Sequence, residues 1–141
     1  MSASSECRIL WTRGLRALIA GDANGAATQL TTAAGMLPPH GRVVAPFSSH
    51  GELWFDVASA DIKAGRDNDA ARWLERLQSS FERVFSPDGY ARSFFLLGQI
   101  YDRAGDDTRA RRQYARFLDL WRDGDLERGW VEEAERKVGR K

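Results

Sequence analysis

Cysteine and histidine are scarce in this chain of 141 residues. Cys7 is the only cysteine, so an intramolecular disulfide is impossible and nothing requires an oxidising compartment. The two histidines, His40 and His50, do not have a usual zinc-ligand spacing, and we expect both to be exposed in or beside a proline-rich stretch. The formal net charge is only +1, which leaves no electrostatic footprint for nucleic acid or an anionic membrane.

Long apolar runs are also missing. The first apolar run, residues 9–20, is interrupted by Arg13 and Arg16, so it is a poor signal peptide and cannot span a membrane. We therefore expect a cytoplasmic protein without a membrane segment. Apolar residues still make up 43% of the chain and aromatic residues 11%, which is enough for one globular domain over residues 1–141.

Three short strings repeat along the chain: AGDANGAA at 20–27, AGRDNDAA at 64–71 and AGDDTRAR at 104–111. Around the glycine of each string, the same residue types recur at the same spacing. Each repeat has a large apolar residue and then a small residue before the glycine, and an alanine and then another large residue after it. These columns are Leu10, Trp54 and Phe94; Gly14, Ala58 and Gly98; Ala26, Ala70 and Ala110; and Leu30, Leu74 and Tyr114.

The spacing of these columns predicts two antiparallel helices per repeat, joined at the glycine. Glycine supplies the left-handed backbone conformation that ends a helix. The polar residues that follow it can cap the second helix, through Asp22, through Asp67 or Asn68, and through Asp106. We expect the small residue of the first helix to face the alanine of the second, because two small residues let helix axes approach closely.

These repeats resemble tetratricopeptide repeats, whose pattern has an aromatic residue, a Leu-Gly pair, a Tyr and later an Ala. The second repeat has Asp61 in place of the Tyr, and the first has Arg13 in place of the Leu. The third repeat matches best, through Phe94, Leu97, Gly98, Tyr101, Ala110 and Tyr114. The resemblance covers about residues 5–122, and it implies an α-solenoid that binds proteins or peptides.

The repeats depart from the family in spacing. Their turn glycines are 44 and 40 residues apart, against about 34 in the family pattern. The extra residues form a proline-rich linker at 38–49, which ends at a possible cap on Ser49, and a segment at 79–90. In that segment we expect the helix to continue through Phe81 and Phe85 before a new helix begins at Ser86-Pro87.

The predicted fold is all-α: an α-solenoid of three helical hairpins and a C-terminal capping helix. The repeats cover about residues 5–37, 49–85 and 88–122, and the cap covers about 126–138. We expect seven helices, near residues 5–20, 23–36, 49–64, 68–85, 88–104, 106–122 and 126–138. The third repeat and its tail, with the run Phe117-Leu118-x-x-Trp121, also resemble the last repeat of tetratricopeptide regions at the ends of bacterial signalling proteins.

A partner-binding groove is expected on the inner face of the array, which the first helix of each repeat would line. Trp11, Phe55 and Phe95 are equivalent positions, and they could form a ladder of aromatic anchors; the alternative is that the rings only pack between repeats. Family members that grip a chaperone terminus need Lys and Asn where this chain has Trp11 and Leu15, so chaperone binding is not predicted. The candidate groove residues are Arg8, Trp11, Leu15, Glu52, Phe55, Asp56, Ser59, Arg92, Phe95, Gln99 and Arg103.

A second candidate surface is a basic strip on the outer, convex side. Arg72 and Arg76 of the second repeat correspond to Arg112 and Arg116 of the third. The strip could dock an acidic partner. The alternative is a solvated face on which the arginine stems cover apolar surface.

The remaining candidate for chemistry is the acid cluster Asp102, Asp106 and Asp107. Asp106 and Asp107 stand where a helix begins, so capping explains them better than metal binding. No nucleophile elbow or phosphate loop is evident, and we predict no catalytic residues, cofactor or metal.

The predicted function is therefore a non-catalytic scaffold that binds a protein or peptide of unknown identity, with no nucleic-acid or membrane partner. The alternative is a structural or homo-oligomerisation module of a larger bacterial signalling protein, such as a homodimer. A distant alternative is a small enzyme that uses the acid cluster.

Overall fold

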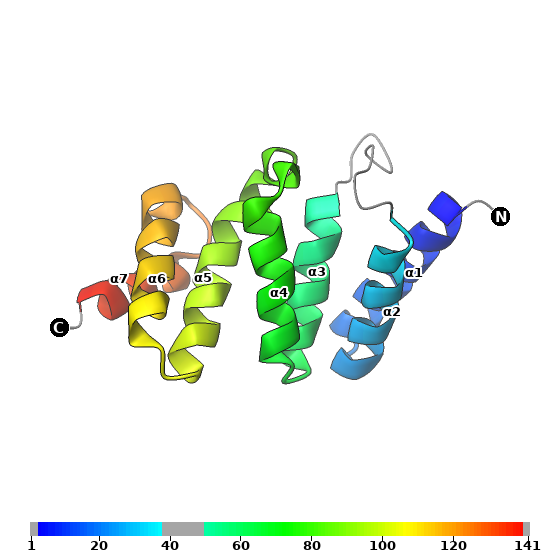
Figure 1. Cartoon of the computed structure of the whole chain (residues 1–141), viewed down its shortest axis with the longest axis horizontal. Helices are drawn as coiled ribbons and strands as arrows, with labels where there is room; N and C mark the ends of the chain where they lie inside the picture. Colours follow the sequence, from blue (N-terminus) through cyan, green and yellow to red (C-terminus); the bar gives the residue numbers. More distant parts are fainter. Residues whose placement is uncertain (1–2, 38–49, 140–141) are drawn as a thin grey trace. The chain divides into compact units, whose positions relative to one another are not determined.

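The computed structural model describes residues 3–37 and 50–139, and within them it has seven α-helices and one short 3-10 helix (Figure 1). The all-helical prediction is confirmed. The elements are α1 (Ala3–Ile19), α2 (Ala23–Gly35), α3 (His50–Lys63), α4 (Asp67–Ser79), the 3-10 helix η1 (Phe81–Val84), α5 (Pro87–Arg103), α6 (Asp107–Trp121) and α7 (Arg128–Gly139). None of these helices is long and apolar enough to cross a membrane.

The chain divides into two compact units, which we call the N-terminal unit (Met1–Ser86) and the C-terminal unit (Pro87–Lys141). In the N-terminal unit α1 packs on α2, α2 on α3 and α3 on α4. In the C-terminal unit α5 packs on α6 and α6 on α7. Each repeat is thus a helical hairpin, and within each unit a hairpin contacts the next helix: α2 packs on α3, and α6 on α7. A single domain over residues 1–141 stays a prediction.

The hairpin turns follow the prediction at all three glycines. Gly21, Gly65 and Gly105 have φ angles of 86°, 77° and 79°, in the left-handed region that glycine adopts without strain. The next backbone N–H closes the helix end in each case. For example, the Asp106 N–H donates to the Tyr101 carbonyl oxygen at 2.9 Å.

The helix caps follow the prediction in two repeats of three. The side chains of Asp22 and Asp106 each accept the backbone N–H three residues later. In the second repeat Arg66 occupies the N-cap position and makes no side-chain capping bond. The expected caps, Asp67 and Asn68, are wrong, because Asp67 is already the first residue of α4.

The small-residue column makes a different contact from the one predicted. A Cβ atom at Gly98 would come within 2.8 Å of the Tyr114 ring, and one at Gly14 within 2.5 Å of the Leu30 side chain. The expected closest partner of Gly98 was Ala110. The small residue in the first helix instead makes room for the large, fully buried residue of the second helix.

The end of α4 also differs from the prediction of one helix through residue 85. The helix ends at Ser79, and Ser80 is extended, with φ −90° and ψ 154°. The Ser80 hydroxyl accepts the backbone N–H of Glu82 at 3.1 Å, which starts η1 instead of another α-helical turn. Phe81 and Phe85 consequently remain 70% and 50% exposed.

Three further expectations concern chain connections. The linker 38–49, with His40 and the Ser49 cap, lies outside the described residues. His50 was expected to be exposed, but it is only 1% exposed, because its ring packs near Trp54 with centroids 6.1 Å apart. The helix α5 begins at Pro87, one residue before the start of the predicted helix 88–104.

Candidate partner-binding surfaces

The candidate groove residues of the N-terminal unit lie on α1 and α3. The Trp11 indole N–H donates to Asp56 Oδ2 at 2.7 Å, which ties the first helices of two successive repeats together. Trp11 and Phe55 are half-buried and pack against the hydrophobic core of the unit. We call Trp11, Phe55 and Asp56 the Trp11 cluster; it joins aromatic surface to a carboxylate.

The other candidates in this unit flank the Trp11 cluster in sequence. Leu15 and Glu52 are half-buried, and Arg8 is exposed. The Ser59 hydroxyl donates to the backbone carbonyl of Phe55 at 2.9 Å, so this hydroxyl supports α3.

The pKa of the Asp56 carboxyl group is raised above its usual value. Burial raises its pKa from 3.8 to about 6, the hydrogen bond from Trp11 opposes that rise, and the charge of Glu52 adds to it. The folded protein therefore binds this proton more tightly than the unfolded chain does.

The raised pKa of Asp56 predicts that its contribution to stability falls as pH rises from about 4 to about 6. Asp56→Asn keeps an oxygen that can accept the Trp11 hydrogen bond but removes the ionisation. We expect the variant to gain stability relative to wild type at about pH 7 and to gain little at about pH 4. Urea unfolding of both proteins at the two pH values measures this difference, and a difference independent of pH would contradict it.

In the C-terminal unit, Phe95 does not lie on an open surface. Its side chain is 0% exposed, and it stacks on Trp130 of α7 with centroids 4.3 Å apart and an interplanar angle of 9°. Tyr114 and Phe117 of α6 contact the same ring, at centroid distances of 5.6 and 5.3 Å. Phe95 is therefore a core residue, and the hypothesis that its ring is an accessible anchor is corrected.

The contacts between α5 and the segment that contains α7 have a constant spacing in the sequence. Three contacts join α5 to this part of the chain: Arg92 with Glu127 at 3.5 Å, Phe95 with Trp130, and Asp102 with Lys137. In every pair the two residues are 35 positions apart. Since the family period is about 34, α7 occupies the place of the first helix of a further repeat. Of the other candidates on α5, Gln99 is half-buried and Arg103 is exposed.

The predicted basic strip has residues in both units, and three of its four arginines have contacts of their own. Arg72 pairs with Asp69 on the same helix. The guanidinium of Arg76 lies 4.3 Å from the ring centroid of Trp54. Arg116 lies 5.9 Å from the Phe94 ring, and Arg112 is exposed. Arg76 and Arg116 thus cover aromatic surface, as the alternative explanation of the strip expects.

The acid cluster is divided between separate partners. Asp106 caps α6 and accepts a bond from the Arg109 guanidinium at 2.6 Å, and these bonds hold the pKa of Asp106 below its usual value. Asp102 pairs with Lys137 instead. Asp107 is the first residue of α6. Within residues 3–37 and 50–139, no group of three or more acidic, His or Cys side chains could hold a metal ion.

Paired helices, left-handed glycine turns and, within each unit, packing of a hairpin on the following helix define an α-helical repeat protein. The chain belongs to the tetratricopeptide repeat family, whose sequence pattern matches residues 51–123. Among solved structures, it is similar to the Sgt2 tetratricopeptide repeat domain from Aspergillus fumigatus, with a TM-score of 0.64 and 21% sequence identity. That match covers 94% of this chain and 79% of the other, and it supports the fold. A comparison with curated protein sequences found no match.

Proposed function

We propose that this chain is a non-catalytic scaffold that binds a peptide segment of a partner protein on the Trp11 cluster. Membership in the tetratricopeptide repeat family supports a protein-interaction scaffold in general. The observation that carries the finer proposal is the hydrogen bond between Trp11 and Asp56. It fixes an aromatic ring and a carboxylate side by side on two successive first helices.

The chemistry of the Trp11 cluster suits a peptide with an apolar anchor residue. The Trp11 and Phe55 rings are half-buried, so each is held by the core while part of its surface stays accessible. Rigid aromatic rings of this kind carry much of the energy in peptide interfaces. On α5 of the C-terminal unit, Phe95 is buried under Trp130, so the proposal rests on α1 and α3 alone.

A random peptide library displayed on phage tests this proposal without a known partner. We expect selection on the wild-type protein to yield peptides whose binding Phe55→Ala weakens by about tenfold or more. Phe81→Ala is the matched control, because Phe81 is 70% exposed on η1 and lies outside the Trp11 cluster. Peptides that bind wild type and Phe55→Ala equally well would count against the proposal.

A further inference from the structure

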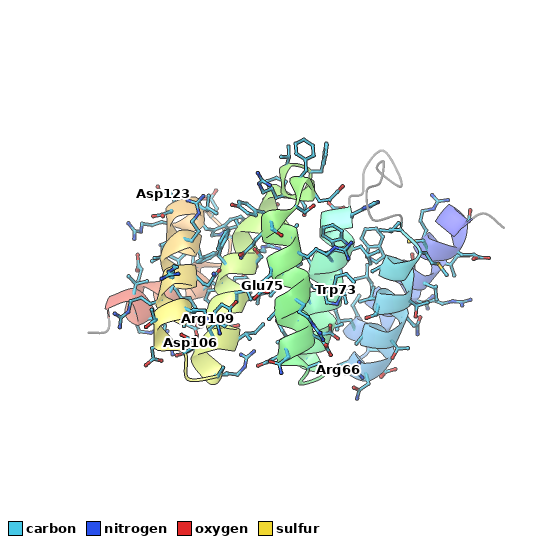
Figure 2. The ribbon with its side chains drawn as sticks, in the orientation of Figure 1. Arg66, Trp73, Glu75, Asp106, Arg109 and Asp123 are labelled. Atoms are coloured by element: carbon cyan, nitrogen blue, oxygen red, sulfur yellow. The ribbon has the colours of Figure 1, made fainter. Side chains whose placement is uncertain are left out.

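A pocket opens on the N-terminal unit between α2, α3 and α4, away from the Trp11 cluster. Its volume is about 430 Å³. Trp73 of α4 and Arg66, the N-cap residue of α4, line it, and Figure 2 shows both on the side of this helix that faces α2, away from Glu75. Asp61 reaches it from α3. A volume of this size is typical of small-molecule sites.

The pocket coincides with the position where the second repeat departs from the family. Asp61 stands in the column that holds Tyr101 in the third repeat. There the Tyr101 ring is buried, and the guanidinium of Arg109 lies 4.5 Å from its centroid. The residue equivalent to Arg109 in the second repeat is Asp69. The second repeat therefore lacks both the ring and the arginine that covers it.

Asp61 is the buried acidic residue of this pocket. The residue is only 3% exposed, and it is one of the residues that line the pocket. Burial and the charge of Asp69 raise its pKa to about 6, against the opposing charges of Arg66 and Arg72. Burying a carboxylate is costly unless donors compensate it, so a ligand with N–H donors would stabilise the charged form of Asp61.

The rim of the pocket has the opposite charge. Arg66 donates to the Asn24 side chain at 3.2 Å, and Arg72 pairs with Asp69. The guanidinium of Arg76 lies over the rings of Trp54 and Trp73, and it has no carboxylate partner in the part of the chain described. The rim thus offers a guanidinium that aromatic rings hold in place.

We propose that this pocket binds a free α-amino acid with an apolar side chain. Its ammonium group would donate to Asp61, its carboxylate would contact the arginines of the rim, and its side chain would pack on Trp73. The three arginines of the pocket would repel a ligand that carries only an ammonium group, and Asp61 and Asp69 would repel a ligand that carries only a carboxylate. A zwitterion, which carries both charges, therefore complements the pocket better than either. This site is independent of peptide binding by the Trp11 cluster.

Calorimetric titration with phenylalanine and with leucine tests the proposal. We expect saturable binding of at least one of them. We expect at least about tenfold weaker binding of phenethylamine, which lacks the carboxylate, and of 3-phenylpropionate, which lacks the ammonium group. Absence of binding by both amino acids at about 10 mM would overturn the proposal, and so would equal binding of phenethylamine and phenylalanine.

Two substitutions at Asp61 test whether the amino acid binds in this pocket. Asp61→Asn removes the charge with little change of shape, and we expect it to weaken amino-acid binding by about tenfold or more. Asp61→Tyr restores the residue type of the third repeat and should abolish binding while the protein stays folded, as circular dichroism would show. Arg116→Gln is a control outside the pocket, since Arg116 belongs to the C-terminal unit, and binding should be unchanged. Wild-type affinity in Asp61→Asn would refute the assignment.

Discussion

Replacing Phe95 by alanine is expected to lower the free energy of unfolding by about 3–5 kcal/mol. The ring is 0% exposed and contacts aromatic side chains of both α6 and α7. Its removal leaves a cavity among Tyr114, Phe117 and Trp130, and it removes the stacking partner that holds α7 against α5. Urea unfolding followed by far-UV circular dichroism measures the loss.

Phe55→Ala is the matched control for this substitution, because Phe55 occupies the equivalent column of the second repeat. Phe55 is half-buried, so its truncation removes fewer contacts and should destabilise the protein less. An equal or larger loss in Phe55→Ala would show that the ring of Phe95 is less tightly enclosed than its burial indicates.

Gly98→Ala is expected to destabilise the protein by about 1–3 kcal/mol, although alanine is the better helix former. The new methyl carbon would lie 2.8 Å from the ring of Tyr114, which is itself 0% exposed and cannot move aside freely. Overpacking in a rigid interior therefore outweighs the gain in helix propensity. Thermal and urea unfolding of the single variant measure the net effect.

Gly129→Ala supplies a control of opposite sign. A methyl group at Gly129 in α7 would meet nothing within 4 Å. Only the change in backbone entropy remains, and it should stabilise the protein by up to about 0.5–1 kcal/mol. If both alanine variants changed stability in the same direction, the close contact between Gly98 and Tyr114 would not be the cause of the loss.

The hairpin architecture was predictable because local chemistry determines it. Gly21, Gly65 and Gly105 are needed for the left-handed turns, and each lies at the same distance from the flanking apolar columns. A threefold repetition strengthens a signal that would be weak in one copy. The end of α4 was missed because Phe81 and Phe85 continue the helical apolar spacing, while one extended residue, Ser80, interrupts the backbone.

The candidate site was only partly predictable. The sequence identified Trp11, Phe55 and Phe95 as equivalent positions, but equivalence in a repeat does not fix exposure. A neighbouring helix decides it: α7 buries Phe95 through Trp130, whereas Trp11 and Phe55 remain half-buried. The departure at Asp61 was visible as a missing Tyr. Its consequence, a buried carboxylate in a pocket, depended on side chains of α4 that a single column does not describe.

The constant 35-residue offset between α5 and α7 has a consequence for protein engineering. The α5–α6 hairpin binds α7 through a ring stack and an ion pair, at the position where a hydrogen bond from Trp11 joins α1 to Asp56 of α3 in the first two repeats. The face of the α5–α6 hairpin that binds α7 can therefore accept the first helix of another module. A longer array could be assembled by grafting a complete hairpin in place of α7, with an aromatic residue retained at the position of Trp130 and a cation at that of Lys137.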